Sequence, residues 1–387
     1  MQEYMQEPQR EIPVMGDYDV AVVGGGVAGI AAALSAARAG ARTVLLERQF
    51  ALGGLATLGL VTIYLPLCDG CGRQVSFGIA EELLRLSVRL DNPPPSVLGW
   101  KDGVTRGRFQ CDFNPQQFAI LAEQLLLEAG VDILYGIQVC GAAVSQGRIE
   151  GIFCESISGR TAIRAKSFVD ASGDAVLCQA AGEETADFAR KNILAAWYYT
   201  AKNHRLHMLG VADLPEGERL AAPINQKRYS GLTCESQTEF MVDGHQALLQ
   251  DFLKKGSFTA EHQLAEISTV PQLRMTRRLV GVTEVTEQTG SVPDSIGLIG
   301  NWKRPGPVYE LPFSCLYGRR IRNLITAGRC ISAEAQMWDN TRVIPACAVT
   351  GEAAGLAAAM GQDFAALPVE SLRSILRQRG IPLSAKE

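Results

Sequence analysis

The chain has 387 residues, a net charge of −4 and 47% hydrophobic residues, so it can hold two or three domains with cores of their own. It has no block of basic residues, and we therefore expect neither nucleic acid nor a membrane as a partner. Its ten cysteines are scattered along the chain, which is typical of free thiols in a reducing compartment. We expect a cytoplasmic protein.

The N-terminal part predicts a leader followed by a strand, a turn and a helix. Residues 1–16 are polar and lack the apolar core of a signal peptide, so we expect a flexible leader. The apolar run Val20–Val23 suits a buried parallel strand and leads into GGGVAG at residues 24–29, a GxGxxG motif. Its glycines allow a tight turn, the approach of a pyrophosphate and close helix packing. We expect five contacts with a dinucleotide here: Gly24, Gly26, Val27, Ala28 and Gly29.

A second predicted strand, Thr43–Leu46, ends at an acid. Glu47 lies 23 residues after Gly24 (47 − 24), where a carboxylate accepts hydrogen bonds from ribose hydroxyls and repels a 2′-phosphate. The paired glycines that follow let the backbone pass close to a flat or phosphorylated group. We expect further cofactor contacts from this stretch: Glu47, Arg48, Gly53, Gly54, Leu55 and Thr57.

Residues 49–68 have the length of a membrane span, because they run for 20 positions without a charge. They also contain Gly53, Gly54, Gly59 and Pro66, which would break a helix. Since broken backbone cannot face lipid, we expect a loop along a buried cofactor.

Two helices and a small meander are predicted next. Helical periodicity covers Gly78–Leu90 and a second stretch that begins at Asn114 and ends at Gly130. From Asp132 to Ser172 the period falls to two, with turns at Gln146-Gly147 and Ser158-Gly159, which predicts an antiparallel meander beside the parallel strands. This part is expected to add cofactor contacts: Val139, Ala171, Ser172, Gly173 and Asp174.

Residues 183–319 are richer in aromatic and charged residues and contain all four histidines, which indicates an inserted domain. His245, in the sequence DGH, is a candidate catalytic residue, although a lone histidine is more often a core or surface residue. Arg277 and Arg278 cannot easily face one pocket, because adjacent residues point in different directions. We name Arg278 as a candidate for binding a substrate carboxylate through its planar fork. Surface charge is the alternative.

From Leu324 the sequence again has the pattern of the dinucleotide domain, with an apolar strand, a glycine turn and small residues. LITAGRCIS predicts a strand that enters a glycine turn, and RVIP precedes a helix of small residues. We expect the dinucleotide domain to be discontinuous, with residues 17–182 and 320–365, and residues 366–387 to form a C-terminal helix and tail. The last group of expected cofactor contacts lies here: Gly328, Arg329, Arg342, Val343, Gly351 and Ala354.

Cys68 and Cys71 form the one close cysteine pair in the sequence. A zinc site needs about four ligands and a cubane cluster about four thiolates, so we expect no metal. The pair can be a redox dithiol or two ordinary thiols, and the sequence leaves both open.

These blocks resemble the stand-alone FAD-dependent oxidoreductases of the glutathione-reductase superfamily, in the branch that shares its flavin domain with heterodisulfide reductase A-like proteins. The resemblance covers nearly all of the chain from Tyr18 onward. It rests on these motifs: GGGVAG with Glu47, LGGLATLG, DGCGRQVSFGIAEELL, VDASGDA, RRLVGVTEV, DSIGLIGNW, YELPFSCL and NLITAGRCISAEAQMWDNTRVIPACAVTGEAAGLAAA.

The resemblance implies an α/β fold: a Rossmann-like FAD-binding domain, made of a parallel sheet and a small antiparallel meander, with an inserted α+β substrate domain. It implies FAD as cofactor and hydride transfer between a small organic substrate and flavin N5. Arg342 and the helix behind it would then face the flavin pyrimidine and favour the reduced anion, unless Arg342 is a structural ion pair. An electron-transfer protein that serves a redox protein partner is the alternative. Assembly into a homo-oligomer stays open.

Overall fold

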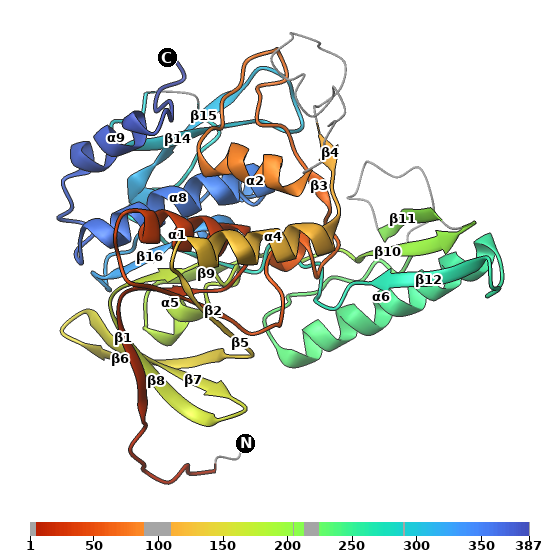
Figure 1. Ribbon diagram of the computed structural model, residues 1–387, viewed down its shortest axis with the longest axis horizontal. Helices are drawn as coiled ribbons and strands as arrows, with labels where there is room; N and C mark the ends of the chain where they lie inside the picture. Colours follow the sequence, from red (N-terminus) through yellow and green to blue (C-terminus); the bar gives the residue numbers. More distant parts are fainter. Residues whose placement is uncertain (1–4, 89–109, 204, 213–223, 289–290, 387) are drawn as a thin grey trace.

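A seven-stranded sheet forms the centre of the computed structural model, which describes residues 5–88, 110–203, 205–212, 224–288 and 291–386 (Figure 1). The order is β5-β2-β1-β8-β7-β6, and β16 also pairs with β8. The strands β5, β2, β1, β8 and β16 are parallel, whereas β6, β7 and β8 form the antiparallel meander. The bounds are β1 (Val14–Val23), β2 (Thr43–Glu47), β5 (Asp132–Tyr135), β6 (Gln138–Ser145), β7 (Arg148–Ser156), β8 (Gly159–Asp170) and β16 (Leu324–Thr326).

The start of β1 corrects the expected leader of residues 1–16. Val14 pairs with Ala162, and the Ala162 N–H donates to the Pro13 carbonyl at 2.9 Å. The last residues of the expected leader therefore belong to the strand. Their side chains are polar or exposed, so only the backbone pairing with β8 reveals the longer strand.

Helices α1 (Val27–Arg38) and α8 (Ile344–Met360) lie against each other on one side of the sheet. Their contact depends on glycine: a Cβ at Gly351 would lie 2.3 Å from the Ala28 carbonyl oxygen, and one at Gly355 would lie 2.0 Å from that of Ala32. Small residues in both helices thus bring the C-terminal part of the chain against the N-terminal glycine motif.

Three further helices cover this layer (Figure 1): α2 (Ile79–Ser87), α4 (Pro115–Glu128) and α9 (Val369–Gln378). The predicted start of α4 is confirmed, because the Asn114 side chain accepts a hydrogen bond from the Gln117 N–H and Pro115 occupies the first turn. The short helix α5 (Val176–Ala180) packs against β6 and β8.

A second lobe projects from this body, on the right of Figure 1. Its sheet has the order β11-β10-β12, and the long helix α6 packs against β10 and β11. Tyr198, Leu248 and Phe252 form part of its separate core. The bounds are β10 (Ala195–Lys202), β11 (Arg205–Ala212), β12 (His262–Ile267) and α6 (Cys234–Lys255).

The packing shifts two expected boundaries. The end of the expected inserted domain, with β14 (Ser295–Gly300) and β15 (Val308–Pro312), places Ile296 and Leu311 in the same core as α1 and α8. The α9 residue Leu372 joins that core as well, so the expected separate segment 366–387 is part of the larger body. Composition could not show this, because core membership depends on contacts between segments far apart in sequence.

Short elements complete the described fold. Near the junction of the two lobes, β9 (Thr185–Asp187) pairs with β13 (Arg277–Leu279). Elsewhere β3 (Ile63–Tyr64) pairs with β4 (Cys111–Asp112). The remaining bounds are η1 (Gly54–Ala56), η3 (Phe313–Cys315), η4 (Gly328–Cys330) and α7 (Ala335–Thr341).

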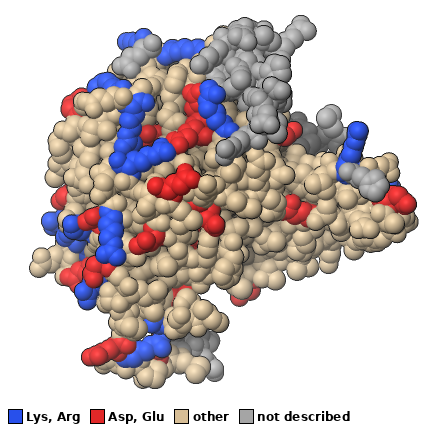
Figure 2. All heavy atoms as spheres, viewed as in Figure 1, with Lys and Arg blue, Asp and Glu red and all other residues tan. Residues whose placement is uncertain are grey.

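The surface carries charges of both signs. Lysine and arginine side chains are interspersed with aspartate and glutamate on the face seen in Figure 2. In the described part of the chain no single helix has the length and apolar character to cross a bilayer, although the bent pair α7 and α8 passes that test when taken together.

The contact between α1 and α8 leads to a prediction about the free energy of unfolding. Gly355→Ala places a Cβ against the Ala32 carbonyl, and we expect it to lower the free energy of unfolding by about 1–3 kcal/mol through overpacking. Gly244→Ala in α6 is the matched control, since its Cβ would lie 3.3 Å from the Ala196 Cβ, a far milder contact, and alanine favours a helix. Urea denaturation measures both. Equal stability of the two variants would contradict the close contact.

Candidate active site

A cavity that is partly open to solvent lies at the carboxyl ends of the parallel strands. Ligands bind at this edge in open α/β sheets. A smaller cavity near Ile137 and Val139 shares five of its residues: Gly24, Glu47, Arg48, Ser172 and Asp174. Together the two cavities form a long site, as an extended dinucleotide requires.

The glycine turn after β1 is shaped for a phosphate. Gly24 has φ +101°, and a Cβ there would lie 2.6 Å from the Ala171 carbonyl oxygen, so the turn requires glycine. A Cβ at Gly26 would meet no protein atom within 4 Å, although Gly26 lines the cavity. Gly26 also begins α1, where no side chain caps the helix and no acid lies in the first turn. This open space beside free N–H groups fits a pyrophosphate.

Glu47 is held in place by two backbone groups. Its Oε2 accepts a hydrogen bond from the Gly25 N–H at 2.6 Å, and its Oε1 accepts one from the Gln49 N–H at 2.7 Å. The carboxylate lines both cavities. Each oxygen keeps a lone pair for a ribose hydroxyl, which is the role that the sequence predicts for it.

A second glycine loop lies against the first. The Gly53 N–H donates to the Gly25 carbonyl at 2.8 Å, and a Cβ at Gly54 would lie 3.3 Å from the Gly26 Cα. The Thr57 hydroxyl donates to the Leu52 carbonyl at 2.5 Å and so fixes the loop. The cavity wall therefore consists of bare backbone at these glycines.

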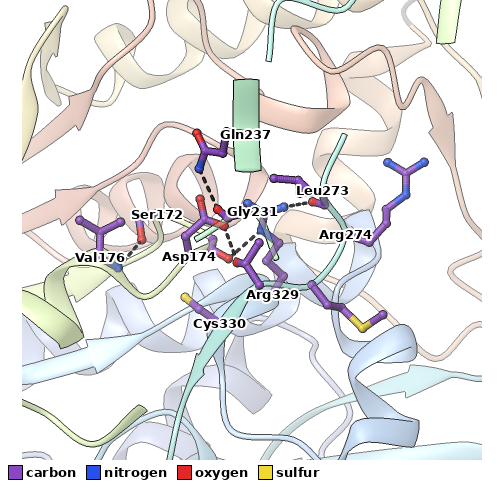
Figure 3. Close-up of polar contacts among 12 residues, drawn as sticks. Ser172, Asp174, Val176, Gly231, Gln237, Leu273, Arg274, Arg329 and Cys330 are labelled. Carbon is purple, nitrogen blue, oxygen red and sulfur yellow. Dashed lines mark hydrogen bonds and ion pairs between the residues drawn. The ribbon is translucent and has the colours of Figure 1, made fainter. Parts of the chain in front are cut away.

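An ion pair within the larger body holds a segment of the second lobe by hydrogen bonds (Figure 3). The Arg329 Nη2 lies 2.8 Å from the Asp174 Oδ1, and its Nε donates to the Gly173 carbonyl at 2.7 Å. The same guanidinium donates to the Leu273 carbonyl, while the Thr276 hydroxyl donates to Asp174 at 2.6 Å. Asp174 and Arg329 therefore fix the position of the segment that closes the cavity from the lobe.

Arg342 lines the cavity at the end of α7 and pairs with Asp339, which also pairs with Lys303. Burial opposes ionisation of Asp339, but Arg342 and Lys303 hold the pKa of this carboxyl below its usual value. The Nε of Arg342 is buried without a hydrogen-bond partner among the described residues. The structure thus shows both an ion pair and a side chain that faces the cavity.

The N-terminus of α8 faces the same space. Ile344 and Cys347 line the cavity, and no side chain caps this helix end. Burial raises the pKa of the Cys347 thiol to about 12, so the thiol is neutral near pH 7. The neutral sulfur adds no negative charge opposite Arg342.

Seventeen of the 22 predicted cofactor residues line one of the two cavities. The other five support the wall from behind. A Cβ at Gly29 would lie 1.8 Å from the Gly24 carbonyl oxygen, which explains the glycine as a packing requirement. The five residues are Gly29, Thr57, Val343, Gly351 and Ala354.

Two predicted catalytic residues are placed elsewhere. Arg278 pairs with Glu284 at 2.8 Å and does not line the cavity. His245 lines a separate small cavity with Trp197 and Phe240, between α6 and β10. The structure corrects both assignments, since neither side chain lines the cofactor cavity.

Sequence reasoning missed the wall that the second lobe contributes. Four residues of the lobe line the cavity without forming a motif: Gln237, Val270, Pro271 and Leu273. Cys68 and Cys71 do not line it, so their role as a dithiol gains no support from position. Within the described segments no group of three or more His, Cys, Asp or Glu side chains is placed to hold a metal ion.

Comparison with known proteins agrees with the cofactor cavity. The family model described as FAD dependent oxidoreductase matches residues 19–192 and 183–376. The chain therefore belongs to this family of FAD-dependent enzymes, and its cofactor is FAD.

Individual relatives are distant. Thioredoxin reductase of Ureaplasma parvum serovar 3 is 34% identical over 73 residues, which cover 19% of this chain and 24% of that protein. The chain thus spans about a quarter of that curated relative's length. Among solved structures, a geranylgeranyl bacteriochlorophyll reductase-like protein from Thermoplasma acidophilum is 14% identical (94% and 84% covered, TM-score 0.48). The p-nitrophenol 4-monooxygenase of Pseudomonas putida DLL-E4 is 13% identical (94% and 81% covered, TM-score 0.48).

The charges around Arg342 lead to a prediction about the flavin midpoint potential. Arg342→Met removes a positive charge from the cavity wall and should lower the flavin midpoint potential, because the reduced anion loses a stabilising charge. A shift of roughly 30 mV corresponds to about 1.4 kcal/mol for a two-electron couple. Asp339→Asn is the matched control and should raise the potential. Unchanged potentials in both variants, with FAD bound, would show that the pair is purely structural.

Proposed function

We propose that this enzyme transfers a hydride between a small organic substrate and noncovalently bound FAD. The observation that carries the proposal is the composition of the cavity wall. Glycine loops of the larger body form one side, and Gln237, Val270 and Leu273 of the second lobe lie on the other. A cavity shared by two lobes favours a ligand held between them.

The residues of the chain would bind and orient the two reactants. The first turn of α1 and Glu47 hold the pyrophosphate and the ribose. Leu55, Leu58 and Val270 form an apolar wall that excludes water from the reacting region. FAD, when bound, supplies a ring that accepts or releases a hydride. The contribution of the protein is then position and electrostatics.

The resemblance to heterodisulfide reductase A-like proteins supports a second proposal, in which electrons pass to a protein partner. The cavity wall from the second lobe favours the first proposal over this one.

All ten cysteines are free thiols, which supports a reducing compartment such as the cytoplasm.

Photoreduction of the FAD-loaded protein under anaerobic conditions separates the two proposals. The flavin should be reoxidised rapidly by at least one small organic acceptor from a chemical panel, and absorbance at the flavin bands measures this. Ferredoxin and thioredoxin serve as protein acceptors for comparison. Reoxidation by these proteins alone would contradict the small-substrate proposal and support the electron-transfer role.

A further inference from the structure

Helix α6 carries apolar side chains on two opposite faces. Its inner face packs Phe240 and Phe252 into the cores of the second lobe, where both are almost fully buried. On the opposite face Val242, Leu249 and Leu253 have exposed fractions of 48%, 42% and 50%. A helix that covers a core normally presents polar residues to solvent on this side. The three exposed side chains therefore require an explanation.

The spacing of these side chains forms one stripe. Leu249 follows Val242 after seven positions, and Leu253 follows after four more, which places all three on one line along the helix. The exposed Gln246 lies between Val242 and Leu249 on the same line. This is the heptad pattern of a helix that pairs with another helix, with one polar layer that sets the register. Apolar residues that are exposed singly do not show such a pattern.

The position of α6 leaves this stripe open to a second helix. The helix lies along the lower edge of the projecting lobe, and its sheet lies on the other side of it (Figure 1). Its 22 residues make it about 33 Å long, and the stripe from Val242 to Leu253 covers about 17 Å of that length. A contact of this length is smaller than a standard protein interface, so it predicts a weak, concentration-dependent association.

The charges beside the stripe differ between the two ends of α6. Glu235 and Glu239 lie in the N-terminal half, and Lys254 and Lys255 lie at the C-terminal end. Glu239 pairs with Lys227 at 2.9 Å, whereas neither Glu235 nor Lys254 forms a salt bridge with another described residue. An antiparallel pair of α6 helices would bring each acidic half beside a basic end. A parallel pair would bring like charges together.

We propose that α6 pairs in an antiparallel arrangement with α6 of a second copy of this chain, so that the enzyme forms a homodimer. A twofold axis makes the same surface serve both copies. Val242 would lie opposite Leu253 of the second copy, and Gln246 opposite Leu249. In this register Glu239 lies within one turn of Lys254 of the second copy. The proposal is independent of the hydride transfer proposed above.

The acidic half of α6 favours a second copy over a lipid surface. Helices that lie on membranes are rich in lysine and arginine on the polar face, and they are attracted to anionic lipids. Glu235 and Glu239 beside the stripe would be repelled by such lipids. The same two acids are complementary to the basic end of a second α6.

The test is sedimentation equilibrium of the FAD-loaded full-length protein over a series of concentrations. The wild type should pass from monomer to dimer as the concentration rises. Leu249→Glu should weaken association by roughly tenfold or more, because it places a charge in the apolar seam. Leu127→Glu is the matched control, since Leu127 is 57% exposed on α4, and this variant should dimerise like the wild type. Flavin absorbance and thermal unfolding show that each variant is folded.

Charge reversal tests the antiparallel register. Glu239→Lys and Lys254→Glu should each weaken association a few-fold, the usual effect of exposed ion pairs, and the double variant should restore it. A wild type that stays monomeric at every concentration would overturn the proposal, and binding of that monomer to anionic vesicles would assign the stripe to a membrane. Wild-type association of Leu249→Glu, or a double variant weaker than both single variants, would overturn it as well.

Discussion

The uncapped first turn of α1 is the constraint on which the rest of the structure depends. Its free N–H groups must face a ligand, and the helix must lie against the sheet closely enough to aim them there. Gly29 allows α1 to lie close to the glycine turn at Gly24. Gly355 allows α8 to pack closely against the other side of α1. The C-terminal part of the chain therefore completes a site that the N-terminal part begins. The discontinuous order of the chain follows from this packing.

Electrostatics divides the site into two regions. At one end, the α1 N-terminus and Glu47 provide donors and acceptors that suit the pyrophosphate and ribose. At the other end, Arg342 and the α8 N-terminus carry positive character toward the cavity. The ion pair of Arg329 and Asp174 lies between them and ties the lobe to the sheet. A FAD-dependent enzyme needs both regions, because the cofactor must be held at one end and tuned at the other.

Local patterns in the sequence predicted most of the fold and most of the residues that line the cofactor cavity from the larger body. The strand, glycine turn and helix around Gly24 are encoded within about 30 residues, and each residue type has a direct physical reason. The same reasoning could not tell which glycines line the cavity and which are required for packing. Gly26 and Gly29 are both motif glycines, and only the structure shows that the Gly24 carbonyl lies against Gly29. It also chose Arg278 as a candidate for substrate binding, since the pairing of Arg278 with Glu284 is visible only in three dimensions. Leu273 of the second lobe lines the cavity, but no sequence motif around it predicts that position.

The most direct test of the account is the FAD affinity of Gly26→Ala. The backbone of Gly26 has φ −68° and ψ 178°, which alanine adopts without strain, and its Cβ would meet no protein atom within 4 Å. The apo-protein should therefore unfold at the same temperature as the wild type, while the methyl group occupies the space expected for the pyrophosphate. The account predicts that FAD binding falls by at least roughly tenfold, the equivalent of about 1.4 kcal/mol. Wild-type affinity for FAD in this variant would contradict the placement of the cofactor at the N-terminus of α1.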